Sequence, residues 1–382
     1  MIKVLNVNTS LDLKSGGGTA ERTFQMSHFL SQIDVHCTVL TLDVELDADR
    51  VAAVSPAEVV ALSCIWKRFY VPQLKWFIIR RLVGQADVIH LMGHWSVLNA
   101  LVYVAIQFSR KPYVVCPAGA LPLFGRSGWF KRLYNVVVGQ AIICNASGWI
   151  AVTTGEFPHF ESYGIPASRV TVIPNGVSEA DFPPIDRATF LRSHGLADTP
   201  IILFMGRLNP IKGPDLLLEA FALIHDRLPK HQLIFAGPDG GMLADLRVRV
   251  DQLELAQRVH FLGHVDGDAK AGAYRSAQLL VVPSRQEAMS IVALEAGVCG
   301  TPVLLTDQCG FSDVQLIDSR LVVPASAKAL ADGMASLLVD PAVLEQIAPA
   351  WKSFVITNYV WEVIAPRYLR LYREILAGKA RS

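Results

Sequence analysis

Short apolar runs alternate along the chain with stretches in which apolar residues recur every three or four positions. The first run, Val4–Val7, is followed by the glycine-rich stretch Ser15–Thr19 and then by apolar residues at helical spacing. This order predicts a strand, a loop and a helix. Further runs in the first half predict strands at Cys37–Leu42, Val88–Leu91, Tyr113–Cys116 and Trp149–Val152. Strands that alternate with helices favour a parallel sheet with helices on both faces.

The pattern changes after Val170–Val177, which contains Pro-Asn-Gly and is followed by two prolines and several acidic residues. Such turn chemistry is typical of a linker between domains. A second series of strands and helices then begins at Ile201–Met205. Its other strands are predicted at Gln232–Ala236, Val259–Leu262, Leu279–Val282 and Pro302–Leu305. We therefore predict an α/β protein with two Rossmann-like, doubly wound domains.

The length of the chain supports this division, because one hydrophobic core rarely serves 382 residues. The expected domains cover residues 1–178 and 179–359. The remaining segment, 360–382, has the pattern of a helix that packs back on the N-terminal domain or on the second one.

Composition and charge exclude several classes of function. The net charge is +1 and charged residues make up 18% of the chain, so a dedicated nucleic-acid binder is not expected. The six cysteines stand singly, without a Cys-x-x-Cys pair or a histidine at metal-ligand spacing. We interpret them as reduced core residues and predict no metal site.

The apolar and basic stretches bear on where the protein resides. The stretch Val97–Phe108 is interrupted by Asn99 and Gln107, and a membrane span needs ~20 apolar residues, so no transmembrane helix is expected. Segments 66–81 and 128–134 mix cations with aromatics and have no acid, which favours an anionic membrane interface. Buried helices with snorkelling cations would give the same pattern. With no signal sequence evident at the N-terminus, we expect a cytoplasmic protein, either free or peripheral on the inner face of the plasma membrane.

Two cations lie in the loop Gly206–Gly213, directly after the first strand of the second domain. In α/β folds, ligands bind at this carboxyl edge of the sheet. Arg207 and Lys212 are flanked by glycines and could both reach one diphosphate. Two solvated loop cations would explain the same residues.

Two carboxylates follow a later buried strand, Glu287 in its loop and Glu295 inside the next helix. The helix N-terminus between them offers amides that suit phosphate oxygens, those of Met289, Ser290 and Ile291. The carboxylates would accept hydrogen bonds from sugar hydroxyls. Alternatively, Glu287 caps the helix and Glu295 lies on a solvated face. The apolar neighbours of Glu295 argue that it has a partner.

Together these motifs resemble glycosyltransferase family 4, the retaining glycosyl transferases group 1 of GT-B fold. The resemblance covers nearly the whole chain and rests on the order of four features: the triple glycine Gly16–Gly18, the loop Gly206–Gly213, the spacing of Glu287 and Glu295, and the turn Gly300–Val303. It implies two Rossmann-like domains that face a central cleft. It also implies a hexosyltransferase-type enzyme (EC 2.4) that needs no metal and no other cofactor.

The resemblance further implies the ligands and the roles of the motif residues. Arg207 and Lys212 would bind the donor diphosphate and stabilise the leaving group, and Gly16, Gly17 and Gly18 would let the backbone approach the phosphates. Glu287 would contact the donor sugar or the reacting centre, and Glu295 the ribose hydroxyls. The donor would be a UDP-, GDP- or ADP-linked sugar. The acceptor would be a saccharide or lipid-linked, as in bacterial surface-polysaccharide or glycolipid assembly.

Retention in such enzymes is explained by attack on the face that the leaving group departs from, with the leaving phosphate taking the acceptor proton. Two positions depart from the family pattern. Met92 stands where the second histidine of a His-x-His pair often falls, so His94 is the candidate for that role, although a histidine at a strand end is commonly structural. Ser290 stands where glycine is common, and we expect it to affect the choice of donor sugar.

Other functions remain open at this point. Asp47–Asp49 and Asp266–Asp268 match the Asp-x-Asp of metal-dependent GT-A transferases, but neither explains the two glutamates. A nicotinamide-dependent dehydrogenase would need Gly-x-Gly-x-x-Gly after a first strand, which neither domain has. A sugar-nucleotide-binding protein without turnover and a GT-B nucleotide-sugar epimerase fit the same motifs. A phosphorylase would need a pyridoxal-binding lysine, and none is identified.

Overall fold

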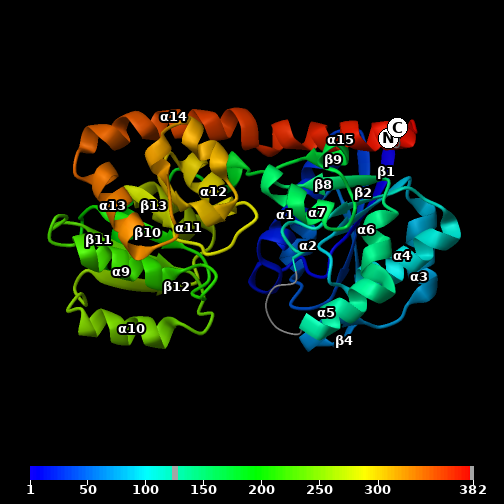
Figure 1. Cartoon of the computed structure of the whole chain (residues 1–382), viewed down its shortest axis with the longest axis horizontal. Helices are drawn as coiled ribbons and strands as arrows, with labels where there is room; N and C mark the ends of the chain where they lie inside the picture. The colour runs from blue at the N-terminus through cyan, green and yellow to red at the C-terminus, as the bar shows by residue number, and fades with distance from the viewer. Residues whose placement is uncertain (123–127, 379–382) are drawn as a thin grey trace. The chain divides into compact units, whose positions relative to one another are not determined.

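The computed structural model describes residues 1–122 and 128–378 of the chain. It divides into two compact units (Figure 1). Unit 1 combines Met1–Gly176 with the segment from Trp361 onward, and unit 2 is Val177–Val360. The expected boundaries, at residues 178 and 359, lie within two residues of these.

Unit 1 has a seven-stranded sheet among its described residues, in the order β3-β2-β1-β6-β7-β8-β9. Every neighbouring pair is parallel. The strands are β1 (Ile2–Val7), β2 (Val35–Leu42), β3 (Glu58–Leu62), β6 (Val88–Met92), β7 (Tyr113–Cys116), β8 (Gly148–Ala151) and β9 (Val170–Val172). All residues of β6, β7 and β8 are buried, as expected for central parallel strands covered on both faces.

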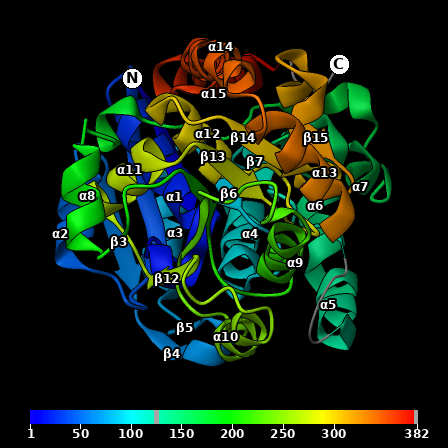
Figure 2. The ribbon, with the colours of Figure 1, turned by 90° about the vertical axis from the view of Figure 1, so that its left-hand side faces the viewer.

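The helices of unit 1 surround this sheet in Figures 1 and 2. They are α1 (Leu13–Ser31), α2 (Ala48–Ala53), α3 (Trp76–Gln85), α4 (Val97–Ser109), α5 (Gly128–Tyr134), α6 (Gln140–Cys144), α7 (Phe157–Glu161) and α15 (Trp361–Leu376). A π-helical turn, η2 (Asn135–Gly139), joins α5 to α6. An antiparallel pair, β4 (Cys64–Trp66) and β5 (Val71–Pro72), is connected by the 3-10 turn η1 (Lys67–Phe69).

The C-terminal helix α15 belongs to unit 1, where it packs on α1. Trp361 at its start is buried and stacks on Phe29 of α1, with 6.2 Å between ring centroids. The same ring lies against Gly176, where an added Cβ would come within 2.6 Å of it. The packing thus needs a glycine at the end of the Pro-Asn-Gly turn.

Unit 2 has a six-stranded sheet in the order β12-β11-β10-β13-β14-β15, again parallel throughout its described residues. The strands are β10 (Ile201–Met205), β11 (Gln232–Ala236), β12 (Val259–Gly263), β13 (Leu279–Val282), β14 (Val303–Thr306) and β15 (Val322–Val323). The helices are α8 (Arg187–Ser193), α9 (Pro214–Ile224), α10 (Leu243–Gln252), α11 (Gly267–Ser276), α12 (Ile291–Cys299), α13 (Ala327–Leu338) and α14 (Pro341–Tyr359).

The α/β class and the doubly wound topology are confirmed, with differences at the edges of the sheets. Strands β3 and β15 were not expected from the pattern. In β3 only Leu62 is buried, because an edge strand has little apolar cover. The strand expected at Pro302–Leu305 is Val303–Thr306 instead. No helix within the described ranges is long and apolar enough to cross a membrane.

Candidate functional site

Strands β10 and β13 are neighbours in the sheet of unit 2, although two strands and three helices separate them in sequence. The strands that follow β10 extend the sheet on one side of this pair, and the strands that follow β13 extend it on the other. The pair is therefore the topological switch point, where open α/β sheets bind ligands. The loop 206–213 follows β10 and the loop 283–290 follows β13. Both motifs expected from the sequence therefore lie at the same place on the carboxyl edge.

The two loops touch through their backbones. Gly213 has φ of +67°, and a Cβ there would lie 2.1 Å from the carbonyl oxygen of Pro283. The amide of Arg285 donates to the carbonyl of Ile211 at 2.7 Å. Glycine at position 213 is thus required both by the backbone conformation and by the close approach.

This contact brings Lys212 and Glu287 together. The Lys212 Nζ lies 2.7 Å from Oε1 of Glu287, and the hydroxyl of Ser284 donates to Oε2 at 3.0 Å. The Glu287 side chain is 13% exposed and that of Lys212 is 31% exposed. The pair is therefore ordered by its surroundings and still open to a ligand. A cap of α12 does not explain Glu287, because the N-cap residue of that helix is Ser290.

Arg207 lies on the other side of the same loop. It is exposed, and its stem rests on Gly240, where a Cβ would meet Cγ of Arg207 at 2.8 Å. The next residue, Leu208, donates through its amide to the carbonyl of Pro238 at 3.0 Å. These contacts hold Arg207 against the loop between β11 and α10.

Glu295 is buried inside α12, with its side chain 7% exposed. Its Oε1 accepts from the Lys270 ammonium at 2.7 Å and its Oε2 from the Tyr274 hydroxyl at 2.6 Å. Burial, and then the Glu295 charge, raise the pKa of Tyr274 well above its usual value, so that its hydroxyl stays a donor. The alternative of a solvated helix face is wrong, and a ligand hydroxyl at Glu295 would have to join or displace the Lys270 ammonium.

The start of α12 contains a buried hydroxyl. Ser290 is fully buried, and its Oγ has no hydrogen-bond partner among the described residues. Buried polar side chains almost always have a partner, and exceptions commonly mark contact with a ligand or water. The turn before it packs on Gly310, where a Cβ would lie 2.2 Å from the carbonyl of Ala288. Ser290 is therefore held in place next to Glu287.

In unit 1 the triple glycine lies within the first turns of α1, where the sequence predicted a loop, and it kinks the helix. Gly17 has φ of +55° and ψ of −142°, which breaks the helical path and suits only glycine well. Asn8, at the carboxyl end of β1, anchors the following turn by donating to the carbonyl of Thr19 at 3.0 Å and to the hydroxyl of Thr23 at 2.8 Å. The glycine loop thus lies at the switch point of this sheet, between β1 and β6.

His94 follows β6 at the same edge and is buried. Its Nε2 lies 3.5 Å from Oδ1 of Asn135, and its ring packs on those of Trp95, Tyr134 and Tyr163 at 4.4 to 5.8 Å. Burial lowers the pKa of His94 to about 4, so the ring is neutral near pH 7. Its Nδ1 has no partner among the described residues. A contact between His94 and the donor sugar remains a prediction.

A buried cation, Arg22 of α1, was missed by the sequence reasoning. Its guanidinium donates to Oδ1 of Asn175 at 2.6 Å, to the carbonyl of Ile173 at 2.8 Å and to the hydroxyl of Tyr368 in α15. Nearby, His90 lies 2.8 Å from the hydroxyl of Tyr372, and burial lowers its pKa to about 3. His90 is thus a structural residue that ties β6 to α15.

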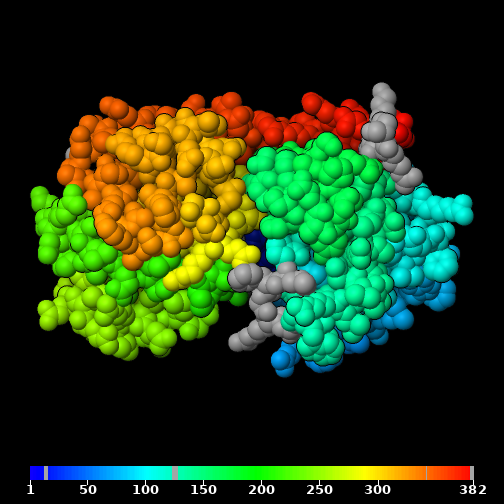
Figure 3. Space-filling view, viewed as in Figure 1, coloured from blue at the N-terminus to red at the C-terminus, as the bar shows by residue number. Residues whose placement is uncertain are grey.

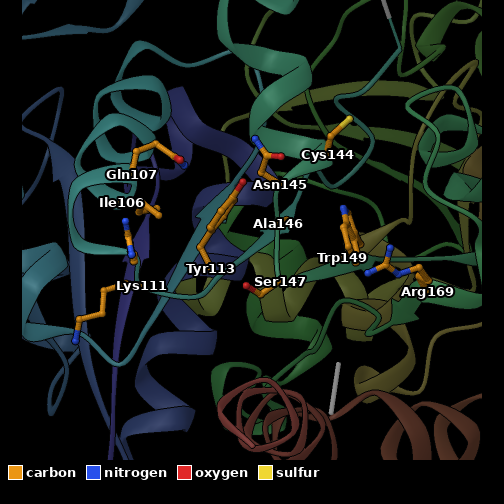
Figure 4. A pocket seen from close by; sticks show the side chains of 11 residues that line it. Ile106, Gln107, Lys111, Tyr113, Cys144, Asn145, Ala146, Ser147, Trp149 and Arg169 are labelled. Carbon is orange, nitrogen blue, oxygen red and sulfur yellow. The ribbon is translucent and has the colours of Figure 1, made fainter. Parts of the chain in front are cut away.

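A cavity of about 610 Å³ lies at the amino ends of β7 and β8 (Figure 4). In Figure 4 Lys111 and Arg169 lie on opposite sides of Tyr113 and Ser147. None of the expected site residues lines it. Helices α4 and α6 end beside it, and cations there complement the partial negative charge of helix C-termini. We therefore do not assign a ligand to it. Among the described residues there is also no group of three or more metal-ligating side chains.

Two family models match the chain in succession. The model for glycosyltransferase family 4 matches residues 16–181, and the model for glycosyl transferases group 1 matches residues 186–353. The first match begins at the glycine loop, and the second contains Arg207, Lys212, Glu287 and Glu295.

Curated relatives include D-inositol 3-phosphate glycosyltransferases. That of Jonesia denitrificans is 35% identical over 202 residues, 49% of this chain and 48% of that protein. That of Geodermatophilus obscurus is 29% identical over 340 residues, 79% of this chain and 74% of that protein. The chain thus spans about half the length of the first of these relatives.

Solved structures share the fold over nearly the whole chain. Sucrose-phosphate synthase from Thermosynechococcus elongatus has a TM-score of 0.78 at 23% identity, covering 99% of this chain and 100% of that one. HepE from Anabaena, in complex with UDP and glucose, has a TM-score of 0.80 at 18% identity, covering 98% and 100%. From these matches and the two doubly wound units, the chain belongs to glycosyltransferase family 4 and has the GT-B fold.

Proposed function

We propose that the chain is a retaining glycosyltransferase that moves a sugar from a nucleotide-sugar donor to an acceptor without a metal ion or other cofactor. The observation that carries this proposal is the Lys212–Glu287 pair at the switch point of unit 2. It places a cation suited to a diphosphate 2.7 Å from a carboxylate suited to sugar hydroxyls.

The donor would lie along the carboxyl edge of this sheet. Lys212 and Arg207 bind the diphosphate and neutralise the charge that grows on the leaving group, as a divalent ion does in metal-dependent transferases. The first amides of α12 and the Ser290 hydroxyl meet a phosphate or the sugar. Glu287 gives up part of its contact with Lys212 and accepts a hydrogen bond from a hydroxyl of the donor sugar. Glu295 accepts hydrogen bonds from the ribose hydroxyls.

The acceptor would attack the sugar on the face that the diphosphate leaves. The acceptor hydroxyl gives its proton to the leaving phosphate, so no separate base is needed and the anomeric configuration is retained. His94, kept neutral by its burial, exchanges a hydrogen bond with the donor sugar rather than taking the proton.

The ligands are part of the same proposal. UDP is the first nucleotide to test, because the structural relative HepE binds it, followed by GDP and ADP. The acceptor is a saccharide or lipid-linked, in bacterial surface-polysaccharide or glycolipid assembly, with inositol 3-phosphate as a comparison suggested by the curated relatives. The protein would work in the cytoplasm, in peripheral contact with the plasma membrane through segments 66–81 and 128–134.

Thermal unfolding with each nucleotide in the presence of EDTA tests the donor site. A ligand present at 100 times its dissociation constant should add ~2.7 kcal/mol to the free energy of unfolding. We expect one nucleotide to stabilise the wild-type chain and to lose this effect in Lys212→Ala. Lys230→Ala, which removes an exposed lysine near the opposite edge of the same sheet, should respond like the wild type.

Two results would contradict the donor site. One is stabilisation by no nucleotide, and the other is stabilisation that appears only when a divalent metal replaces EDTA. Each variant is compared with its own ligand-free unfolding temperature, so that a change in basal stability does not count as a change in binding.

A further inference from the structure

The side chain of Arg285, in the loop 283–290, contacts the loop 206–213 and the helix that follows it. Its guanidinium forms two hydrogen bonds with the carboxylate of Asp215, at 2.8 Å to Oδ1 and at 2.5 Å to Oδ2. The Nη1 also donates to the carbonyl of Pro210 at 2.8 Å. Asp215 stands in the first turn of α9. One side chain thus connects the loop after β13 with both the loop after β10 and the start of α9.

The backbone of the same residue adds to this connection. The Arg285 amide donates to the carbonyl of Ile211 at 2.7 Å, so that one residue contacts two successive carbonyls of the loop 206–213. Inside the loop, Asn209 closes a turn, because its Oδ1 accepts from the amide of Lys212 at 3.0 Å. The turn that presents Lys212 is therefore fixed from inside by Asn209 and from outside by Arg285.

Both partners of the ion pair are charged. Burial alone would raise the pKa of Asp215, but the hydrogen bond and the charge of Arg285, together with the first amides of α9, lower it below its usual value. The side chains of Arg285 and Asp215 are 39% and 37% exposed, so solvent screens their mutual attraction. What a two-pronged pair of this kind contributes above all is a defined geometry.

We propose that Arg285 and Asp215 form a clamp that positions Lys212 for the donor diphosphate. A loop that is already held in its binding conformation binds more tightly, because less ordering is left to occur when the ligand arrives. Arg285 acts through the loop 206–213 and touches no ligand itself, so it is a positioning residue. The role in diphosphate binding rests on the proposed function of Lys212, whereas the clamp itself does not.

A second ion pair of unit 2 supplies a matched control. Arg249 of α10 donates to both carboxylate oxygens of Glu219 in α9, at 2.6 Å and 3.0 Å. These side chains are 43% and 41% exposed, close to the values for the clamp. Figure 3 shows α9, which supplies the carboxylate of both pairs, on the surface of unit 2. The control pair connects two helices, whereas the clamp connects the two loops of the candidate donor site.

Hydrogen exchange in the full chain without ligand tests whether the clamp exists. Arg285→Lys keeps the positive charge and removes the planar fork that bonds the carboxylate and the carbonyl together. We expect the amides of the loop 206–213 to exchange roughly threefold faster in this variant, and similarly in Asp215→Asn. Arg249→Lys should leave the exchange of this loop as in the wild type.

A comparison of UDP with uridine tests the role of the clamp in diphosphate binding. Uridine has no phosphate, so its affinity does not depend on the position of Lys212. In Arg285→Lys, the affinity for UDP should fall roughly fivefold, and that for uridine should stay unchanged. Arg285→Lys combined with Asp215→Asn should bind UDP no more weakly than either variant alone, because both remove one clamp. If GDP or ADP stabilises the chain instead, that nucleotide and its nucleoside are compared.

Three results would overturn the proposal. The first is unchanged exchange of the loop 206–213 in both clamp variants. The second is an equal loss of affinity for UDP and uridine, which would indicate a general loosening of unit 2. The third is full UDP affinity in Arg285→Lys, since a charge at position 285 would then be enough. A wild-type chain that binds no nucleotide would contradict the donor site and with it the role of the clamp there, and the exchange rates would still show whether the clamp exists.

Discussion

The carboxylate of Glu295 is a buried charge with a structural position, and we propose that it also binds a ligand. It lies among apolar side chains and receives two donors from α11, Lys270 and Tyr274. These contacts fix its orientation in a way that a solvated carboxylate would not have. In the proposed function this fixed carboxylate recognises the ribose.

Glu295→Gln keeps the shape of the side chain and removes its charge. Since hydrogen bonds to charged groups contribute ~1.5–3 kcal/mol, we expect nucleotide affinity to fall roughly 10- to 100-fold. Titration calorimetry at neutral pH measures the change, with Glu345→Gln on the exposed face of α14 as the control. An affinity equal to that of the wild type would show that Glu295 only supports α12.

His90 and His94 predict a pH dependence of stability. Burial lowers their pKa to about 3 and about 4, below the value of 6.5 in the unfolded chain. Between these values the unfolded state binds more protons, so each histidine lowers the free energy of unfolding as the pH falls below 6.5. The slope is ~1.4 kcal/mol per pH unit per histidine. Above pH 6.5 neither contributes.

Urea unfolding at pH 7, 6 and 5 checks this expectation. The His94→Gln variant has no titrating group at that position. Its free energy of unfolding should therefore fall less steeply with falling pH, by the slope that one histidine contributes. If the variant and the wild type lose stability in parallel, His94 is protonated in the folded chain and its proposed neutral role is wrong.

At the level of elements, helix α15 is integrated into unit 1 by polar contacts as well as by packing. Tyr368 receives a hydrogen bond from Arg22, which is buried and has no carboxylate among its hydrogen-bond partners in the described residues. Tyr372 makes the corresponding contact with His90. The helix that ends the chain thus completes the polar interior of the domain that begins it.

Tyr368→Phe removes one of the three groups that accept a hydrogen bond from the Arg22 guanidinium. Leaving a buried donor of a charged group unpaired costs ~1–3 kcal/mol, so the free energy of unfolding should fall by that amount. Chemical denaturation measures it. Arg373 is on the same helix, and Arg373→Ala, which breaks an exposed ion pair with Asp34 before β2, should cost at most about 1 kcal/mol. Equal effects of the two substitutions would argue against a special role of Arg22.

The sequence was sufficient for the elements whose pattern is strong. Central strands such as β10 and β13 are apolar at every position. Glycines mark the loop that follows β10 and the first turns of α1. The sequence placed Lys212 and Glu287 in loops that follow strands of the same domain, but it did not predict their ion pair. The alternation of strands with helices gave the α/β class.

Other features depend on residues that are distant in sequence. No local pattern connects Glu295 with Lys270 and Tyr274, because the contact arises from the packing of α11 on α12. Likewise, Arg22 meets Tyr368 only when α15 returns to α1. The edge strand β3 was not predicted, because it is half-exposed and lacks a continuous apolar run. The break of α1 at Gly17 was not predicted either, because it depends on backbone dihedral angles that composition does not encode.

On the scale of the whole molecule, the charged residues proposed to hold the donor all lie in unit 2. Arg207, Lys212, Glu287 and Glu295 belong to Val177–Val360, which has its own sheet and core. This fragment should therefore fold when expressed alone and keep most of the nucleotide affinity of the full chain. Calorimetric titration of the fragment and of its Lys212→Ala variant measures this. A folded fragment that does not bind would place essential donor contacts in unit 1.

Cleavage of the donor tests the central claim most directly, because it separates a transferase from a protein that only binds nucleotide sugars. The nucleotide sugar that contains the stabilising nucleotide is incubated with the wild-type chain in EDTA. NMR then follows the first sugar product that forms. We expect transfer of the sugar to water with retained anomeric configuration and release of the nucleoside diphosphate, slowed ~10²- to 10³-fold in Lys212→Ala. A bound but uncleaved donor, an inverted product or a need for divalent metal would contradict the account.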